Sequence, residues 1–422
     1  MDKKNILKDL ENRGLLYQVT DIKALEKRLK AGPITLYIGF DPTAESLHVG
    51  NLLPILCLKR FQMAGHNPIA VAGGGTGLIG DPSGKSSERM LNPKKTVDEW
   101  TEKIKKQLAQ FLDFDSKKNP ARIVNNYDWL SKLKTIEFLR DIGKHFSIGS
   151  MLSKESVKAR LDAGISYTEF SYMILQAYDF LELYKNYNCE MQAGGSDQWG
   201  NITAGIDLIK KITGGTAFGL TFPLVTKADE TKFGKTESGT IWLDSKKTTP
   251  YQFYQFWINT DDRDVVKFIN YFTFLSENEI SALEEKTERE PEKREAQRVL
   301  AREVTKLVHG RETMLKAEKI SQALFYGNLK DLSEKEIEEG FKDVPSTIIE
   351  KKKEIGFMEL ILTAKVSASK RQAREDIKNG AISVNGEVCT DISKVMRASE
   401  RLWNKYIILR KGKKNYFLIK WI

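Results

Sequence analysis

Strand-like and helix-like patterns of apolar residues alternate along the first part of the chain. A buried strand is predicted at TLYIGF, residues 35–40, and it ends in the turn residues Asp41 and Pro42. A helix is expected to begin near Leu47, and a second strand, PIAVAGG, covers residues 68–74. A long amphipathic helix follows, with apolar residues at Val97, Trp100, Ile104, Leu108 and Phe111. This alternation predicts an α/β fold with a Rossmann-like, doubly wound parallel sheet, which binds ligands beyond the carboxyl ends of its strands.

The second part of the chain has a different pattern. From about Thr249 it becomes helical with aromatic stripes, and the charged, weakly patterned stretch from Asp331 to Glu354 predicts a linker. The last segment predicts a helix stopped by Gly380 and a hairpin that turns at Asn385 and Gly386. We therefore predict a Rossmann-like domain at 1–248, an α-helical domain at 249–330, a linker at 331–354 and a small α+β domain at 355–422.

Basic residues are concentrated at the end of the chain. Of a net charge of +10, residues 365–422 contribute +9, with 14 Lys or Arg against 5 Asp or Glu. A compact basic module suits the binding of a polyanion such as RNA. A solvated basic surface has the same composition, so charge alone does not choose between them.

The sequence lacks the signals of membrane or secreted proteins. No run approaches the roughly 18 apolar residues of a membrane span, and the first residues, MDKKNILKDLENRG, contain no apolar signal region. Cys57, Cys189 and Cys389 lie far apart, without the spacing of a disulfide framework or a zinc site. We expect a protein that works in the reducing cytoplasm, without a membrane.

A first chemical motif, LYIGFDPTAESLHVGN, begins at Leu36 and combines a strand, a tight turn and a helix start. His48 falls in the first turn of the expected helix, where unpaired N–H groups and the helix dipole favour phosphate. Gly50 would let a flat base approach the helix backbone. A lone histidine here is more often a cap or a surface residue, so the whole string carries the prediction.

A second motif, KADETKFGKTESG, lies some 180 residues later. Lys232 and Lys235 are three residues apart, beside Gly234 and Thr236, in a loop without an apolar pattern. Lysines of this kind can close over a triphosphate and neutralise the charge that develops as pyrophosphate leaves. Taken alone, the segment would be interpreted as a solvated basic loop.

A third constellation is YTEFSYMILQAYDF, followed by EMQAGGSDQWGNI. Tyr172, Gln176 and Asp179 occupy positions i, i+4 and i+7, so they project from one helix face. Aromatic residues at helical spacing are more often core residues than ligand contacts. A polar stripe beside aromatic rings nevertheless suits an amphipathic substrate, and a phenolic hydroxyl could supply the donor that a buried acid needs.

The three strings together carry a family resemblance. His48, Val49, Gly50 and Asn51 resemble the HIGH motif of class I aminoacyl-tRNA synthetases, and KFGKT resembles their KMSKS loop. Asn51 departs from the generic last position, and Glu230 stands where a glycine is expected. With the third string included, nearly the whole chain resembles the bacterial-type tyrosyl-tRNA synthetases.

The resemblance implies a role for residues in each motif. The residues that read the hydroxyl group of tyrosine are Tyr37 and Asp179. Those that hold its ammonium group are Asp81, Tyr172 and Gln176, and Gln192 lies near its carboxylate. Those around the nucleoside of ATP are Gly39, Asp41, Gly50, Asn51, Gly195, Asp197 and Gln198. Those that meet the γ-phosphate and the leaving pyrophosphate are Thr43, His48, Lys85, Arg89, Lys232, Lys235 and Thr236. Ile38 replaces the small polar or thiol side chain of some members and cannot bond the ribose.

The implied reaction activates L-tyrosine with ATP to tyrosyl-adenylate and pyrophosphate, then transfers tyrosine to the 3′-terminal adenosine of tRNA(Tyr). Mg²⁺ is expected with ATP, although the sequence shows no metal-ligand set, and no prosthetic group is expected. The last segment, KVSASKRQAREDIKNGAISVNGEVCTD, resembles an S4-type RNA-binding module. Its predicted RNA contacts are Lys370, Arg371, Arg374 and Lys378. The resemblance also implies a homodimer.

Two alternatives remain open from the sequence. A tryptophanyl-tRNA synthetase has a related fold, but Tyr37 and Asp179 argue against an indole substrate. A non-catalytic RNA-binding protein on a synthetase scaffold is a second possibility. The presence together of His48, Lys232 and Lys235 argues against lost catalysis.

Overall fold

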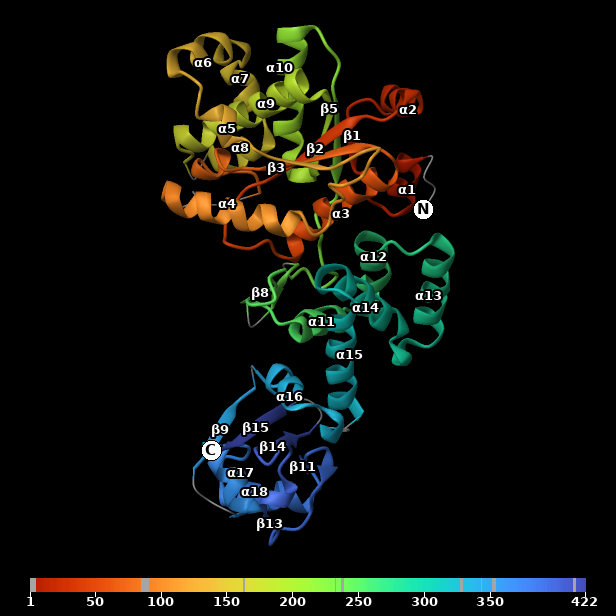
Figure 1. Ribbon diagram of the computed structural model, residues 1–422, viewed down its shortest axis with the longest axis vertical. Coiled ribbons are helices and arrows are strands. Elements are labelled where there is room, and N and C mark those ends of the chain that lie inside the picture. Colours follow the sequence, from red (N-terminus) through yellow and green to blue (C-terminus); the bar gives the residue numbers. More distant parts are fainter. Residues whose placement is uncertain are drawn as a thin grey trace. The chain divides into compact units, whose positions relative to one another are not determined.

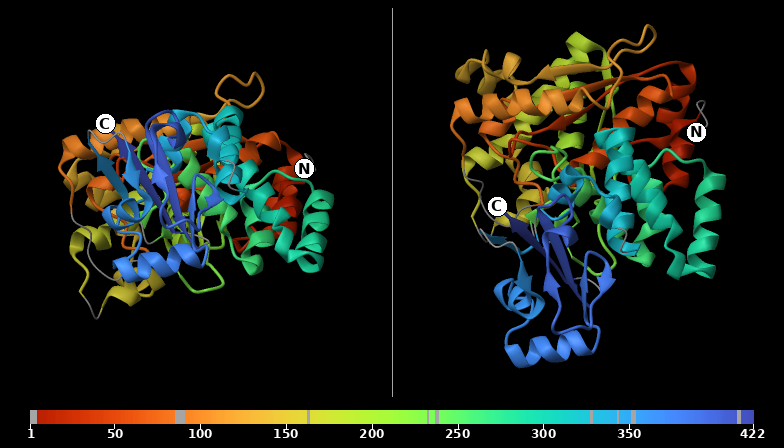
Figure 2. Two further views of the ribbon diagram at one scale, coloured as in Figure 1. Left: turned by 90° about the horizontal axis from the view of Figure 1, so that it is seen from below. Right: turned by 60° about the horizontal axis from the view of Figure 1, so that its bottom comes forward.

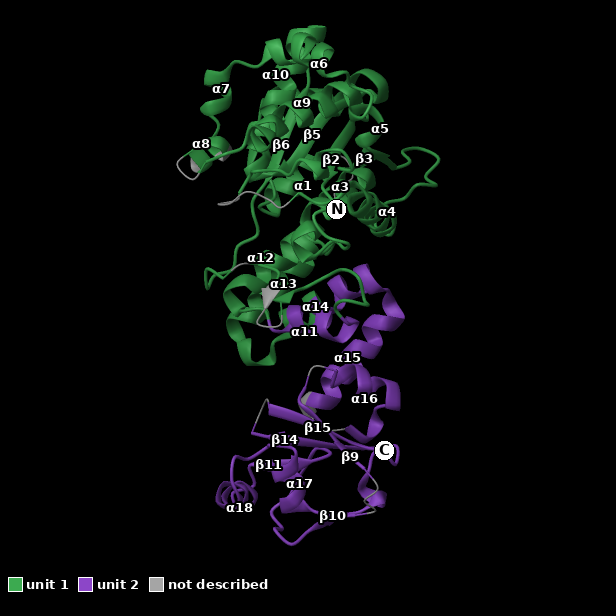
Figure 3. Ribbon diagram, turned by 90° about the vertical axis from the view of Figure 1, so that its left-hand side faces the viewer, with its two compact units in different colours: residues 1–248, 260–300 green, residues 249–259, 301–422 purple. Residues whose placement is uncertain are grey.

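The computed structural model divides into two compact units, shown in green and purple in Figure 3. Unit 1 comprises residues 1–248 and 260–300, and unit 2 comprises residues 249–259 and 301–422. The structure describes residues 5–84, 91–161, 164–231, 233–236, 239–326, 329–342, 344–350, 354–412 and 415–422.

Unit 1 is built on a six-stranded sheet in the order β1-β6-β5-β2-β3-β4. Its strands are β1 (Gln18–Val19), β2 (Thr35–Phe40), β3 (Asn67–Ala72), β4 (Arg122–Asn125), β5 (Cys189–Gly195) and β6 (Phe218–Phe222). Neighbouring strands are parallel except for β1, which pairs antiparallel with β6 at the edge. The central strands are largely buried, as expected of a parallel sheet covered on both faces. The predicted parallel sheet is therefore confirmed.

The strand order reverses between β2 and β5. From β2 the chain moves outward through β3 to β4, whereas from β5 it moves in the opposite direction to β6. Right-handed crossovers then place the two sets of connecting helices on opposite faces of the sheet. α3 (Val49–Met63) and α4 (Lys94–Leu108) pack on β3, while α9 (Tyr167–Tyr187) and α10 (Trp199–Thr213) pack on β5 (Figure 1). The adjoining carboxyl ends of β2 and β5 form the switch point where such sheets bind ligands.

Shorter elements complete unit 1. Its other helices are α1 (Ile6–Asn12), α2 (Ile22–Ala31), α5 (Tyr127–Leu130), α6 (Thr135–Asp141), α7 (Ile148–Leu152), α8 (Glu155–Leu161), α12 (Asp262–Phe272), α13 (Glu277–Arg289) and the start of α14 (Glu295–His309). A small hairpin joins β7 (Lys235–Thr236) to β8 (Gly239–Thr240). Among the described helices of the whole chain, none is long and apolar enough to cross a membrane.

A buried ionic cluster attaches α12 to the sheet unit. Arg60, at the end of α3, is fully buried and donates to the carbonyl oxygens of Asn270 and Thr273. Asp9 of α1 pairs with both Arg60 and Arg13. The segment predicted as one helical domain, 249–330, is accordingly divided between the units, because α12 and α13 join unit 1 while α11 (Pro250–Ile258) and α15 (Arg311–Tyr326) join unit 2.

Unit 2 contains a five-stranded sheet in the order β12-β11-β14-β15-β9, drawn mostly in dark blue in Figure 2. Its elements are α16 (Glu334–Gly340), β9 (Ser346–Ile349), β10 (Ile355–Gly356), α17 (Phe357–Thr363), α18 (Lys370–Lys378), β11 (Ile382–Val384), β12 (Glu387–Val388), β13 (Val395–Met396), β14 (Tyr406–Lys411) and β15 (Asn415–Trp421). Alternate residues of β14 face two cores: Ile407 packs with α17 and α18, and Ile408 packs with α15 and α16. The predicted turn at Asn385 and Gly386 is confirmed, since both have positive φ.

The predicted linker at 331–354 is wrong. Part of it forms α16, whose buried Ile337 belongs to one core of unit 2. Another part forms β9, which pairs in parallel with β15 at the edge of the five-stranded sheet. The segment looks unpatterned because a one-sided helix and an edge strand each bury few side chains, so charged residues dominate their sequence.

Candidate active site at the carboxyl ends of the sheet

Asp41 stands directly after β2 and is held by two hydroxyl groups. Thr76 donates to its Oδ1 atom and Tyr172 donates to its Oδ2 atom, each at 2.7 Å. Thr43 donates its backbone N–H to the Asp41 carbonyl at 2.9 Å, which closes the turn. Tyr172 comes from α9, so the turn after β2 is tied to a helix on the β5 side of the sheet.

Asp179 is buried two turns further along α9. Its carboxylate accepts hydrogen bonds from Asn126 Nδ2 at 2.9 Å and from Trp129 Nε1 at 2.7 Å. Burial raises the pKa of Asp179 to about 7, although the two hydrogen bonds act in the opposite direction. Asn126 also donates to Thr76 Oγ1 at 2.9 Å, which links Asp179 to the Asp41 turn.

Tyr37 and Gln192 are register partners on β2 and β5, each 2% exposed. The Tyr37 hydroxyl and Gln192 Oε1 have no hydrogen-bond partner among the described residues. Burial, and then the nearby charge of Asp179, raise the pKa of the Tyr37 hydroxyl well above its usual value. An unpaired buried polar atom costs about 1–3 kcal/mol, so these two atoms are suited to pair with a polar ligand.

A chain of amides and carboxylates connects the loop after β3 to α9 and α10. Gln198 Nε2 donates to Asp81 Oδ2 at 2.7 Å, and Gln176 Nε2 donates to Gln198 Oε1 at 3.3 Å. Asn201 Nδ2 lies 3.1 Å from both Gln176 Oε1 and Gln198 Oε1. Ser83 donates its backbone N–H to Asp81 Oδ1 at 2.9 Å. Residues from three separate segments thus form one polar network.

Two glycines lie at the ends of β2 and β5 beside these groups, and open space adjoins the first of them. Gly39 is exposed within the otherwise buried strand β2, and a Cβ placed there would meet no atom within 4 Å. A glycine inside a strand often marks a place where a ligand approaches the backbone. At the end of β5, the Asp197 carboxylate lies over Gly195, where a Cβ would be 2.6 Å from its Oδ1 atom. Ile38 is buried.

His48 caps the amino terminus of α3. Its Nδ1 atom accepts the Gly50 N–H at 3.0 Å, and Asn51 Oδ1 accepts the His48 N–H at 3.0 Å, which completes a capping box. A Cβ at Gly50 would lie 2.7 Å from the His48 ring, so a larger residue would displace the imidazole. Asn51, which departs from the generic motif, therefore helps to cap the amino terminus of α3.

The first two motifs are joined by backbone hydrogen bonds. Val49 donates to the Ile241 carbonyl at 3.0 Å, and Ile241 donates to the Gly234 carbonyl at 3.0 Å. Gly234 has φ +78°, and a Cβ there would lie 2.8 Å from Val49 Cγ2, so a side chain would clash with the start of α3. The structure therefore brings HVGN and KFGKT together, as their expected shared chemistry requires.

Some predicted residues lie outside the described part of the chain. These are Lys85, Arg89 and Lys232. Lys235 and Thr236 are described through their backbone, as strand β7. Glu230, which replaces an expected glycine, has φ +61°, a conformation that L side chains rarely adopt.

The sequence interpretation missed Thr76, Asn126, Trp129 and Asn201, which hold the predicted residues in place. Asn126 directly follows β4, as Asp41 directly follows β2. A polar residue after an apolar strand is therefore the sequence signal that could have identified Asn126. β4 was not predicted because RIVN is too short to show a clear pattern.

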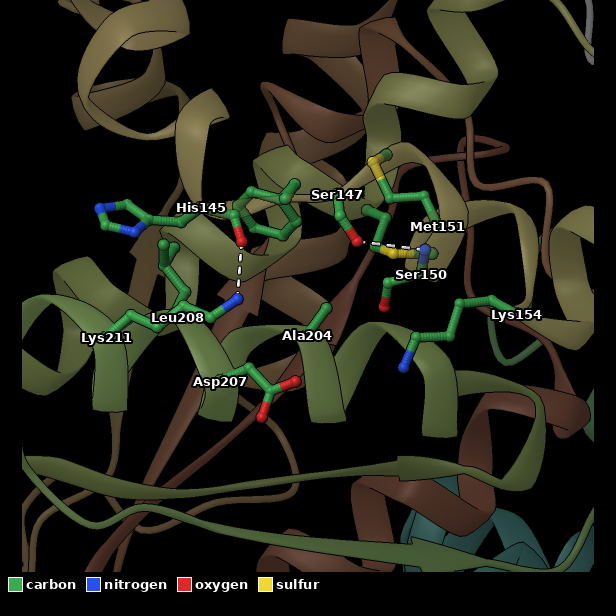
Figure 4. A pocket seen from close by; sticks show the side chains of 11 residues that line it. His145, Ser147, Ser150, Met151, Lys154, Ala204, Asp207, Leu208 and Lys211 are labelled. Carbon is green, nitrogen blue, oxygen red and sulfur yellow. Dashed lines mark hydrogen bonds between the residues drawn. The ribbon is translucent and has the colours of Figure 1, made fainter.

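A cavity of about 40 Å³ lies elsewhere in unit 1, between α10 and the segment around α7 (Figure 4). Lys211 donates to the His145 carbonyl at 2.7 Å at one end, and Lys154 donates to Thr203 Oγ1 at 3.0 Å at the other. None of the predicted site residues lines this cavity.

The predicted RNA contacts Lys370, Arg371, Arg374 and Lys378 are exposed on α18. Lys370, Arg374 and Lys378 are spaced by four residues, so they share one face of the helix. Asp376 points the other way and accepts hydrogen bonds from Ser367 and Lys411. The helix therefore presents a basic outer face.

Comparison with known proteins relates this geometry to a family. The family model of class I tRNA synthetases (W and Y) matches residues 29–326, and that of the tyrosine–tRNA ligase SYY-like C-terminal domain matches residues 336–419. Tyrosine–tRNA ligase 1 of Bacillus subtilis (strain 168) is 61% identical over 417 residues, which cover 98% of this chain and 99% of that protein. The chain belongs to the tyrosyl-tRNA synthetase family. It therefore activates tyrosine with ATP and transfers it to tRNA, as the motifs predicted.

Other relatives agree with this assignment. The tyrosine–tRNA ligase of Geobacillus stearothermophilus is 60% identical over 418 residues, 99% of this chain and 100% of that protein. A solved, C-terminally truncated mitochondrial tyrosyl-tRNA synthetase of Aspergillus nidulans has a TM-score of 0.70 at 31% identity, covering 76% of this chain and 94% of the other. A tryptophanyl-tRNA synthetase of Plasmodium falciparum shares the fold at 13% identity, with a TM-score of 0.53 and coverage of 79% and 87%. The predicted fold and enzyme are confirmed, and the tryptophan and non-catalytic alternatives are not supported.

Proposed function

We propose that Tyr37 and Asp179 recognise the phenolic hydroxyl of the substrate tyrosine. The observation that carries this proposal is the buried Tyr37 hydroxyl, which lacks a partner among the described residues and lies in the field of Asp179. Phenylalanine would leave these groups unpaired. A site built to bond a substrate hydroxyl rejects the analogue that lacks it by about 10⁴–10⁵, a range for which this enzyme family is the usual example. No editing activity is then needed.

The ammonium and carboxylate groups of tyrosine are assigned to the polar network beside this pocket. Asp81, Tyr172 and Gln176 hold the ammonium group. Tyr172 is bonded to the turn after β2, and Asp81 and Gln176 are both bonded to Gln198. Gln192 lies by the carboxylate. Its buried Oε1 atom has no partner among the described residues, and rotation of the amide would turn its NH₂ group to the substrate instead.

ATP is assigned to the open edge beyond β2 and β5. Gly39, Asp41, Gly50, Asn51, Gly195, Asp197 and Gln198 surround the nucleoside. Exposed Gly39 supports this assignment, and the bond from Gln198 to Asp81 supports a place for Gln198 between the two substrates. Thr43 and His48 meet the γ-phosphate. Lys85, Arg89, Lys232, Lys235 and Thr236 meet the departing pyrophosphate.

The chemistry requires positioning more than proton transfer. The tyrosine carboxylate is already the nucleophile, so its in-line attack on the α-phosphate needs no general base and no covalent enzyme intermediate. Lysines and helix N–H groups stabilise the charge that moves to pyrophosphate. Mg²⁺ is expected to be bound as the counterion of ATP. Asp41 already accepts two hydrogen bonds from the protein. This supports the ATP phosphates and water, rather than this carboxylate, as the main ligands of Mg²⁺.

A homodimer is supported by exposed apolar residues along the segment from α6 to the start of α9. Ile136 is 75% exposed and Tyr167 is 70% exposed. Leu139, Ile148, Leu152 and Leu161 of the same segment also have large exposed apolar side chains. An apolar set of this size suits an interface with a second copy. Tyr167→Asp should then raise the monomer fraction in sedimentation, whereas Tyr17→Asp, at another exposed tyrosine, should not.

The basic face of α18 is assigned to tRNA outside its acceptor end, with one tRNA spanning both subunits. We also place the enzyme in the cytoplasm, which suits its three free, buried cysteines.

Tyrosine-dependent exchange of pyrophosphate into ATP tests the pocket. Tyr37→Phe removes the unpaired hydroxyl and should reduce the preference for tyrosine over phenylalanine, while Asp179→Asn should weaken tyrosine binding. Asp98→Asn on the outer face of α4 serves as a matched control. Unchanged exchange in Asp179→Asn would show that the pocket is assigned wrongly.

A further inference from the structure

His48 has a neighbour that lies outside both sequence motifs. The indole ring of Trp242 meets the imidazole edge to face, with ring centroids 6.1 Å apart and planes at 68°. His48 and Trp242 are also paired in an isolated antiparallel β-bridge, next to the bond from Val49 to Ile241. The contact between the rings is therefore set by the backbone on both sides.

The hydrogen bonding of the imidazole gives its orientation a chemical meaning. His48 Nδ1 accepts the Gly50 N–H, so in the neutral ring the proton is on Nε2. Nε2 is then the atom that donates to a phosphate oxygen. A small rotation of the ring would move this donor away from its target, and the Trp242 ring restricts such a rotation.

Trp242 is itself fixed in place. Its backbone N–H donates to Thr248 Oγ1 at 2.9 Å, and Lys247 Nζ lies 5.3 Å from the centre of an indole ring. Lys247 also forms an ion pair with Glu45, three residues before His48. Thr248 and Lys247, which follow Trp242 in the chain, and Glu45, which precedes His48, thus help to hold the indole against the imidazole.

We propose that Trp242 is a positioning residue for adenylate formation, which orients the His48 imidazole toward the γ-phosphate of ATP. The proposal rests on the proposed role of His48. It also gives KFGKT a route to His48, because the backbone of Ile241, the residue before Trp242, is hydrogen-bonded to both Gly234 and Val49. A shift of Gly234 would reach the imidazole through this short stretch of backbone.

Rates of tyrosyl-adenylate formation test the proposal. Trp242→Met and Trp242→Leu remove the ring but keep apolar volume, and we expect each to lower kcat about three- to tenfold with an unchanged KM for tyrosine. Trp242→Phe keeps a ring and should restore most of the rate. Trp100→Leu, at a partly exposed tryptophan of α4, is the matched control and should match the wild type.

A double-mutant cycle with His48→Ala separates the possible outcomes. If Trp242 acts through His48, Trp242→Met has no further effect in the His48→Ala background. The inference about Trp242 is overturned, and the proposed role of His48 is not, by either of two results. One is an equal loss of rate from Trp242→Met in both backgrounds; the other is no loss of rate from Trp242→Met while His48→Ala is impaired. If His48→Ala itself is fully active, the proposed role of His48 fails and the inference fails with it.

A spectroscopic signature distinguishes orientation from loss of fold. The chain has four histidines, so the His48 ring proton can be assigned by NMR as the signal missing from His48→Ala. Its chemical shift should change in Trp242→Met, because the indole ring current is removed, while the other three histidine signals stay in place. A His48 signal that does not move would contradict the contact.

Discussion

The ring of Phe233 stacks on that of Phe272, with centroids 5.4 Å apart and planes only 9° from parallel. Phe268 adds an edge contact at 5.2 Å. Phe233 is the apolar residue of KFGKT, so it anchors the motif on α12. We predict that Phe233→Ala lowers kcat for adenylate formation at least about tenfold, roughly 1.4 kcal/mol, because Phe233 no longer anchors the motif on α12. Stopped-flow measurement of the first turnover would show it.

The matched variant for this prediction is Phe233→Leu, which keeps an apolar side chain between the two rings. Its rate should remain close to that of the wild type. A tyrosine KM that rises in the alanine variant while kcat stays constant would contradict the anchoring role, since tyrosine is bound by other elements.

Local patterns in the sequence were sufficient for elements that are determined locally. The strand at 35–40, the helix after His48 and the hairpin at Asn385 and Gly386 all follow from periodicity, capping and turn chemistry. The same is true of the shared face of Tyr172 and Asp179 on α9.

Contacts between distant segments could not be predicted in this way. Asn126 and Trp129 donate to Asp179 from about 50 residues away, and neither stands in a recognisable motif. The sequence suggested a phenolic donor for Asp179, whereas the structure gives this carboxylate an amide donor and an indole donor. β9 was missed because an edge strand is specified by its partner, β15, which lies at the far end of the chain.

Glu230 has φ +61°, so its backbone carries the strain of a left-handed conformation. Glycine adopts this conformation without a steric penalty, whereas other L residues lose about 1 kcal/mol or more. We predict that Glu230→Gly has a free energy of unfolding about 1 kcal/mol higher than Glu230→Ala, as measured by urea denaturation. Equal stabilities would mean that the strain is absent in solution.

Asp179 should make the stability of the enzyme depend on pH. Burial raises its pKa to about 7, above the roughly 3.9 of an unfolded aspartate. Its contribution to stability is thus fully present below about pH 4 and is lost as the pH rises toward about 7. Between these values the wild type should lose up to about 1.4 kcal/mol per pH unit relative to Asp179→Asn. Parallel stability curves for the two proteins would contradict this pKa.

Tyrosine binding should be coupled to the same proton. If the substrate hydroxyl donates to Asp179, binding favours the ionised carboxylate and releases a proton near neutral pH. Calorimetry at about pH 6.5 in buffers of different ionisation enthalpy would measure this release. The proton release should disappear in Asp179→Asn. Proton uptake by the wild type would mean that Asp179 donates to the substrate hydroxyl instead of accepting from it.

Arg60 is predicted to be one of the most sensitive positions in unit 1. Its buried guanidinium joins Asp9 to the carbonyl oxygens of Asn270 and Thr273, and burial lowers its pKa to about 10. Arg60→Met would leave Arg13 as the remaining guanidinium bonded to Asp9 and these carbonyl oxygens, and the lost buried hydrogen bonds should reduce the free energy of unfolding by about 1–3 kcal/mol. The exposed Arg263→Met is the control and should change it by no more than about 0.5 kcal/mol.

The RNA role of α18 is better tested by point substitution than by truncation. Removal of the chain from Glu354 onward would deprive β9 of β15 and expose a core shared with α15 and α16. The triple variant Lys370→Gln, Arg374→Gln and Lys378→Gln changes only the exposed face of the helix. It should weaken tRNA binding and reduce the slope of log Kd against log salt concentration by about 0.7–0.9 for each phosphate that the helix no longer neutralises.

Adenylate formation should be unaffected in this triple variant, because it needs no tRNA. A matched control exists on α2, where Lys23, Lys27 and Lys30 are three exposed lysines on one short helix. Their replacement by glutamine removes the same charge from the protein as a whole. Equal losses of tRNA affinity in the two variants would mean that net charge attracts the RNA; a loss confined to the α18 variant would mean that this helix contacts it.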